Sequence, residues 1–173
     1  MNNEKTVSRI QAVAAVLLAG LCFIVGSSLR EPLVVVGDRA PGFSLTTDKG
    51  RRISTTDFGG KVLVVNFWAT WCPPCIEELP SLQAMAERLG PKGVVVLGVS
   101  VDRNDAAYRR FVQQARIGFE TWRDPEADIS ASYGTFKYPE TYVIGSDGKV
   151  RQKHVGPRDW MEPSLIQSIE SLL

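Results

Sequence analysis

Continuous apolar runs and amphipathic stretches alternate along most of the chain. Two runs, Val62–Phe67 and Val94–Val101, have the length and composition of strands that are buried on both faces. A helical pattern of apolar positions follows each run, at Glu77–Leu89 and at Ala106–Ala115. Strands that alternate with helices predict an α/β protein whose sheet is covered on both faces.

Two turn sequences predict hairpins, one before and one after these strand–helix units. Each places a glycine, which tolerates a positive φ, between two short segments with strand character. The flanking segments are Phe43–Thr46 and Arg51–Thr55 for the first hairpin, and Thr141–Ile144 and Val150–Val155 for the second. A helical turn at Asp128–Tyr133 and an amphipathic helix at Glu162–Leu173 complete the expected elements.

The N-terminal part of the chain has a different composition, because Ala12–Leu29 is almost wholly apolar. This length is close to the roughly 20 residues that cross a bilayer as a helix, and it exceeds the roughly 7–15 of a signal-peptide core. We therefore expect a single transmembrane helix in a membrane anchor over residues 1–30. A linker is expected over residues 31–36 and one domain over residues 37–173.

Basic residues precede the apolar segment, at Lys5 and Arg9, whereas Arg30 after it is followed by an acidic residue. Positive charge favours the cytoplasmic side of a membrane. The sequence thus predicts a single-pass protein of the cell membrane whose domain faces the periplasm or the cell exterior. Two alternatives are a signal peptide cut after Ser28 and a lipid on Cys22, although a lipoprotein signal needs a small residue before the cysteine.

The composition of the chain limits the classes of molecule that it is expected to bind. The chain has 20 basic and 19 acidic residues, with no basic stripe among aromatic residues, which argues against nucleic acid as a partner. Three cysteines are too few for a disulfide scaffold, but two of them, Cys72 and Cys75, form a Cys-x-x-Cys pair.

The pair lies where a buried strand gives way to a helix. Cys72 is expected at the helix N-terminus, where free backbone N–H groups and the helix dipole favour a thiolate and lower the thiol pKa from about 8.5 to as little as 3.5 in known cases. Cys75 is expected one turn inside the helix and shielded. The exposed thiolate attacks a disulfide, and the second thiol resolves the mixed disulfide. Pro73 and Pro74 stiffen the loop, and their missing N–H groups are tolerated at a helix start.

A Cys-x-x-Cys pair can also be half of a zinc site. No second pair exists, however, and His154 is the only histidine. A copper site would need further soft ligands that the nearby sequence does not offer. We therefore expect no metal and no cofactor other than a redox-active disulfide between Cys72 and Cys75.

Several spaced motifs together resemble one protein family. They are Ala40-Pro41-Gly42-Phe43, Gly60-Lys61, the tryptophan-flanked cysteine pair, Pro80 and Tyr138-Pro139-Glu140-Thr141. Over roughly residues 37–173 the chain resembles the TlpA/ResA-like branch of the thioredoxin superfamily. The resemblance implies a thioredoxin-like fold, with a central mixed β-sheet flanked by helices and an added N-terminal β-hairpin.

The same resemblance implies a function. Its members are anchored outside the cytoplasm and exchange disulfides with protein clients, which here implies a reductase that acts on protein thiols or disulfides. Apocytochrome c is one implied client, and a membrane protein is the implied electron donor. Disulfide exchange is sustained in that compartment because the glutathione pool does not dominate there.

The resemblance also assigns roles to residues around the cysteines. Where a cytosolic thioredoxin has a buried aspartate this chain has Asn66, and Glu78 takes over as a partly buried proton acceptor for Cys75. Glu78 borders the helix face that carries Cys75, although it could instead be a solvated helix carboxylate. We name Cys72, Cys75 and Glu78 as catalytic.

Substrate binding is assigned to residues on both sides of the cysteine pair. Pro139 matches the superfamily's cis-proline, beside which the backbone of Tyr138 pairs with an extended client; an ordinary trans turn proline is the alternative. The candidate substrate-binding residues are Trp71, Pro73, Pro74, Tyr138 and Pro139. Asp102 is interpreted as a cap or loop carboxylate, and His154 receives no catalytic role.

Two other classes of function compete with this prediction. A thiol peroxidase of the peroxiredoxin type shares the Ala-Pro-Gly-Phe opening, but its nucleophile lies in a Thr-x-x-Cys motif, and here Ala69 precedes Cys72 by three residues. A non-catalytic binding or metal-delivery module with the thioredoxin fold has no need to keep both cysteines and the proline opposite them.

Overall fold

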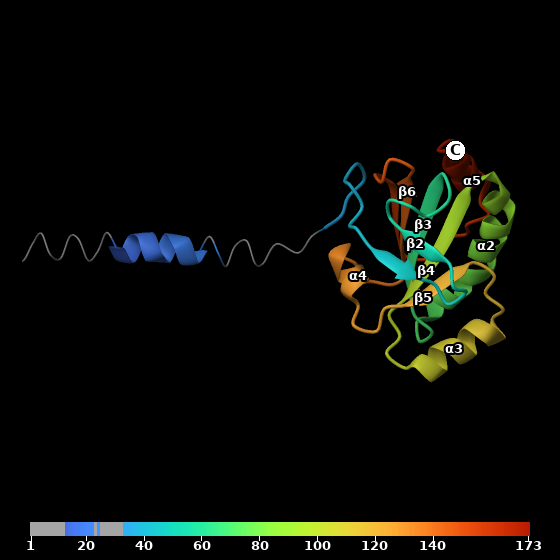
Figure 1. Ribbon diagram of the computed structural model, residues 1–173, viewed down its shortest axis with the longest axis horizontal. Coiled ribbons are helices and arrows are strands. Elements are labelled where there is room, and N and C mark those ends of the chain that lie inside the picture. Colours follow the sequence, from blue (N-terminus) through green and yellow to red (C-terminus); the bar gives the residue numbers. More distant parts are fainter. Residues whose placement is uncertain (1–12, 23, 25–32) are drawn as a thin grey trace, which may run out of the picture. The chain divides into compact units, whose positions relative to one another are not determined.

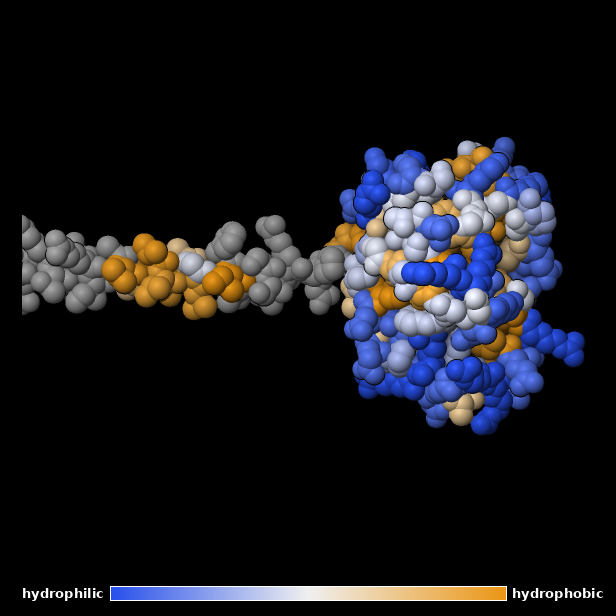
Figure 2. Space-filling model, viewed as in Figure 1, coloured by the Kyte–Doolittle hydropathy of each residue, from blue (hydrophilic) through white to orange (hydrophobic). Residues whose placement is uncertain are grey.

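The computed structural model describes residues 13–22, 24 and 33–173 (Figure 1). Residues 13–22 are helical, and their large apolar side chains are exposed (Figure 2). Within the described residues, no helix combines the length and the hydropathy needed to cross a membrane. The predicted anchor at residues 1–30 lies mostly outside the described residues. Leu33–Leu173 form a compact unit of their own.

A five-stranded mixed sheet forms the centre of this unit, in the order β5-β4-β3-β6-β7 (Figure 1). β3 pairs in parallel with β4, and β4 with β5, whereas β6 and β7 run antiparallel to their neighbours. The strands are β3 (Val62–Trp68), β4 (Val94–Ser100), β5 (Glu120–Arg123), β6 (Glu140–Gly145) and β7 (Val150–Val155). β3 and β4 are buried at every position, as their continuous apolar runs predicted.

Helices connect and cover the strands. They are α2 (Pro73–Leu89), the 3₁₀ turn η1 (Gly90–Lys92), α3 (Asp105–Gln114), α4 (Asp128–Ser132) and α5 (Pro163–Glu170). Helix α2 begins four residues earlier than the expected Glu77, because Pro73 and Pro74 fit the first helical positions, where no N–H is required.

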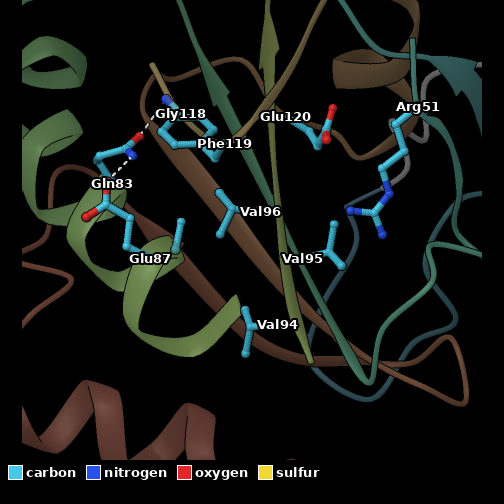
Figure 3. A pocket seen from close by; sticks show the side chains of 10 residues that line it. Arg51, Gln83, Glu87, Val94, Val95, Val96, Gly118, Phe119 and Glu120 are labelled. Carbon is cyan, nitrogen blue, oxygen red and sulfur yellow. Dashed lines mark hydrogen bonds between the residues drawn. The ribbon is translucent and has the colours of Figure 1, made fainter. Parts of the chain in front are cut away.

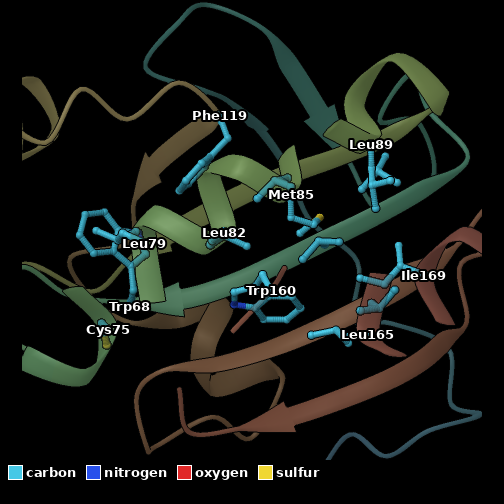
Figure 4. Packing of buried hydrophobic residues seen from close by; sticks show 14 of the residues in the cluster. Trp68, Cys75, Leu79, Leu82, Met85, Leu89, Phe119, Trp160, Leu165 and Ile169 are labelled. Carbon is cyan, nitrogen blue, oxygen red and sulfur yellow. The ribbon is translucent and has the colours of Figure 1, made fainter. Parts of the chain in front are cut away.

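Alternate residues of β3 point into two separate cores. Val62, Val64 and Trp68 pack against α2, α3 and α5 on one face of the sheet (Figure 4). Leu63 and Val65 face the other side, into a core that also contains Tyr133 and the first residues of the compact unit. The sheet is thus covered on both faces, as the alternation of strands and helices predicted.

Two further strands lie in the segment where the first hairpin was expected. β1 (Ser44–Thr46) and β2 (Arg52–Ser54) pair antiparallel in a separate two-stranded sheet. Thr47 N donates to Arg51 O (2.8 Å). Gly50 adopts a φ of 81°, the positive φ that a glycine was expected to provide in this turn.

One strand was not expected from the sequence. β5 has four residues, and only Thr121 among them is fully buried. Its strand conformation follows from parallel pairing with Leu97–Ser100 of β4, which extends the sheet at that edge. The pattern of this segment contains neither an apolar run nor an alternation from which a strand could be predicted.

Candidate active site

Cys72 and Cys75 lie at the junction of β3 and α2 and form a disulfide, with 5.3 Å between their Cα atoms. Cys72 is the N-cap residue of α2, and its carbonyl accepts hydrogen bonds from Cys75 N (3.0 Å) and Ile76 N (3.2 Å). Cys72 is 5% exposed and Cys75 is 0% exposed. Cys72 is therefore the sulfur nearer to solvent, at the end of the helix that stabilises a thiolate.

A buried carboxylate holds the loop that leads into the cysteine pair. Asp102, just after β4, accepts hydrogen bonds from Thr70 N (2.9 Å), Thr70 Oγ1 (2.7 Å) and Ser100 Oγ (2.6 Å). It is 3% exposed. Asp102 is thus a loop carboxylate, as the sequence indicated, and it binds Thr70 of the active-site loop.

The segment before β6 lies beside this loop. The Tyr138–Pro139 peptide bond is cis, as the resemblance implied. The ring of Tyr138 meets the ring of Trp71 edge to face, with 6.1 Å between centroids. Trp71 is 62% exposed, so it offers a large aromatic surface next to Cys72. The structure therefore brings Trp71 and Tyr138 together with the cysteine pair.

Glu78 is buried, so its interpretation as a solvated helix carboxylate is wrong. Its Oε1 accepts a hydrogen bond from Asn66 Nδ2 (2.8 Å), and its Oε2 accepts from Arg158 N (3.0 Å) and Trp160 Nε1 (3.2 Å). Burial raises the pKa of the Glu78 carboxyl above its usual value, although these hydrogen bonds and the charge of Arg158 favour the ionised form.

The carboxylate of Glu78 belongs to the side of α2 that carries Cys75. The two residues are three apart on the helix, and Trp160, which donates to Glu78, packs in the same core as Cys75 (Figure 4). A buried carboxylate with a raised pKa, on the same helix face as a buried cysteine, can serve as a proton acceptor when that cysteine is reduced.

Sequence reasoning missed the groups that hold Glu78 from outside its own helix. Arg158 and Trp160 lie in the loop between β7 and α5, about 80 positions further along the chain, and no spacing connects them with α2. Asn66 also donates to Thr141 Oγ1 (2.9 Å), which links the carboxylate to β6.

In the described part of the chain, no group of three or more His, Cys, Asp or Glu side chains could hold a metal ion. His154 lies edge-on to Trp160, with 5.5 Å between ring centroids, and its Nε2 is 3.0 Å from Gln152 Oε1. Burial lowers the pKa of His154, and the charge of Arg158 acts in the same direction.

Comparison with known proteins assigns this geometry to a family. The model of the AhpC/TSA family matches residues 36–153. The thiol-disulfide oxidoreductase ResA of Bacillus thuringiensis subsp. konkukian is 34% identical over 147 residues, covering 82% of this chain and 85% of the relative. The thioredoxin-like protein YneN of Bacillus subtilis is 34% identical over 131 residues, or 75% of this chain and 76% of the relative.

A solved structure leads to the same conclusion. A Chlorobium tepidum protein described as a thiol:disulfide interchange protein DsbE is 31% identical, with a TM-score of 0.73, over 80% of this chain and 98% of that protein. The names of the ResA relative and of the DsbE structure refer to disulfide exchange, and the cysteine pair of this chain forms a disulfide at the expected junction. The chain belongs to the AhpC/TSA family and is a ResA-like thiol-disulfide oxidoreductase with a thioredoxin-like fold.

Proposed function

We propose that this oxidoreductase is a membrane-tethered reductase that acts outside the cytoplasm on disulfides of protein clients, with apocytochrome c among them. Cys72 is its nucleophile and Cys75 its resolving thiol. The observation that carries these roles is the difference in burial at one helix start. Cys72 caps α2 and retains access to solvent, whereas Cys75 has none.

In the reaction, the Cys72 thiolate attacks one sulfur of the client disulfide and displaces the other as a thiolate. Cys75 then transfers its thiol proton to Glu78. The resulting Cys75 thiolate attacks the Cys72 sulfur of the mixed disulfide. The second client sulfur leaves as a thiolate, and the Cys72–Cys75 disulfide forms. Two electrons have moved to the client, and a membrane dithiol donor restores the reduced pair by the same steps in reverse.

The client is expected to lie against the surface made by Trp71, Pro73, Pro74, Tyr138 and Pro139. The cis peptide bond precedes β6, and the ring of Tyr138 contacts Trp71 beside the disulfide. An extended client segment can pair with the backbone of Tyr138 as an added strand, while the exposed indole covers its side chains.

Support for the tether comes from the N-terminal helix and its flanks. The helix at residues 13–22 exposes Val16, Leu17 and Leu18, which favours an apolar environment over water. Lys5 and Arg9 precede it and favour a cytoplasmic N-terminus. Under this proposal the domain that follows faces the periplasm or the cell exterior.

Trapping of the mixed disulfide tests the proposal. Cys75→Ser removes the resolving thiol, so the full-length variant in spheroplasts is expected to accumulate covalent complexes with clients that a reductant releases. Cys72→Ser is the matched control and is expected to accumulate none. Complexes on Cys72→Ser but not on Cys75→Ser would reverse the roles, and clients confined to the cytoplasm would contradict the topology.

A further inference from the structure

A second surface feature begins beside the cysteine pair and has no part in the reaction above. It is a hollow of about 320 Å³ between α2 and the end of α3, lined mainly by apolar side chains that include Leu79, Phe111 and Phe119. Figure 2 shows hydrophobic surface between these two helices. Surface hollows with an apolar lining favour apolar groups over water.

The hollow continues the helix face that begins at Cys72. Ile76 and Pro80, which both line it, follow Cys72 by four and eight residues and therefore lie on the same side of α2. Ile76 N donates to Cys72 O (3.2 Å), so the rim of the hollow touches the nucleophile's own backbone. At about 1.5 Å of rise per residue, its centre is roughly 9 Å from Cys72 along the helix axis.

A polar partition closes the far end. Gln83 reaches from α2 to the loop before β5, where its Oε1 accepts from Gly118 N (2.8 Å), and its Nε2 donates to Glu87 Oε1 (2.6 Å) (Figure 3). Beyond it lies a different hollow with the charged side chains of Arg51 and Glu120 (Figure 3). The apolar hollow is therefore short and is bounded by the disulfide region at one end and by Gln83 at the other.

We propose that this hollow is a client subsite that takes one apolar side chain of the polypeptide whose cysteine is bound to Cys72. The proposal rests on the proposed function, because the client must approach Cys72. An extended chain advances about 3.3 Å per residue, so an offset of roughly 9 Å corresponds to about three residues. The reductase thus prefers clients with a large apolar residue about three positions from the reacting cysteine.

Peptides test the preference and its register. Each peptide carries one cysteine as a mixed disulfide with thionitrobenzoate, in a Ser/Gly background with a single leucine moved from position −5 to +5. The full-length reduced protein in detergent attacks the peptide sulfur and releases the coloured thiolate. We expect kcat/KM to peak about tenfold above the other positions when leucine is about three residues away on one side of the cysteine. The peptides have one composition, so partition into detergent does not produce a peak.

Two matched substitutions on α3 and its C-cap connect the peak with the hollow. Ala115 is exposed at its rim, so Ala115→Arg is expected to flatten the profile. Ala106 is exposed on the same helix outside the hollow, and Ala106→Arg is expected to keep the peak. Ala115→Leu, a smaller change, decides the question if Ala115→Arg loses all activity.

The outcomes separate the two proposals. A flat profile for the wild type, or a peak that both Ala115 variants retain, overturns the subsite while the reductase proposal stands. A wild type that reduces none of the peptides overturns the proposed reduction of polypeptide disulfides itself.

Discussion

At the scale of single residues, the proposed role of Glu78 depends on how its surroundings act on the charge of its carboxylate. The carboxylate is buried although a charged group prefers water, and three donors surround it, one from β3 and two from the loop between β7 and α5. Burial without donors would hold the group protonated, and full solvation would leave it too weak a base. Burial therefore raises the pKa of the Glu78 carboxyl, and the hydrogen bonds and the charge of Arg158 act in the opposite direction.

The first prediction concerns Glu78→Gln, which keeps the shape of the side chain and removes the base. Resolution of a preformed Cys72 mixed disulfide is expected to slow by about 100-fold at neutral pH, the scale of general base catalysis. In the wild type the rate should rise with pH as Glu78 ionises, because only the carboxylate accepts a proton. That rise should begin above the usual pKa of a glutamate, since the pKa of Glu78 is raised.

Stopped-flow measurement of the released client thiol gives these rates. Alkylation of Cys72 in the reduced protein is the control, because it needs no proton transfer from Cys75 and should change little in Glu78→Gln. Equal resolution rates for the two proteins from about pH 6 to 9, which spans the ordinary thiol pKa, would leave Glu78 without a role in the proton transfer.

At the scale of elements, the sequence predicts what local pattern determines. The apolar runs of β3 and β4 are local and indicated the sheet centre correctly. The cysteine motif placed Cys72 correctly at the helix N-terminus, whereas the apolar pattern alone began the helix four residues too late, at Glu77. β5 was missed because its strand conformation depends on pairing with β4. Asp102 was assigned only to a loop because its partner Thr70 lies 32 positions away.

The second prediction tests this connection between β4 and the active-site loop. Thr70→Val keeps the backbone N–H and the shape of the side chain but removes the hydroxyl that donates to Asp102. The buried carboxylate then lacks a donor, which costs about 1–3 kcal/mol. Denaturant unfolding of the oxidised protein measures the loss. Thr70→Ser retains the donor and is the control; a Thr70→Val stability within about 0.5 kcal/mol of Thr70→Ser would mean that the hydroxyl contributes little.

At the scale of the whole molecule, the sheet lies between two cores, and the face away from α2 is completed by the first residues of the compact unit. Val34 is buried at 6% exposure. Its N donates to Tyr133 O (3.4 Å), and its O accepts from Lys153 Nζ (3.2 Å). Gly37 N donates to Val150 O (2.9 Å). The segment expected as a linker at residues 31–36 therefore includes residues that pack on the domain.

The last prediction compares two truncations that differ only in this segment. A fragment of residues 33–173 retains Val34 and should fold without the N-terminal helix, because its cores and sheet are complete. A fragment of residues 37–173 exposes the surface that Val34 covers, which costs about 2 kcal/mol for the side chain and its hydrogen bonds. Denaturant unfolding of both fragments gives the difference in free energy.

Single substitutions in the longer fragment separate burial from chain length. Val34→Ala should lose about 1–2 kcal/mol, whereas Val35→Ala, at a side chain that is 53% exposed, should change stability by less than about 0.5 kcal/mol. Equal stability of the two fragments would place the start of the folded domain at Gly37 and leave residues 33–36 as a linker. A less stable short fragment would instead place the start of the folded domain before Gly37, because residues 33–36 then contribute to its stability.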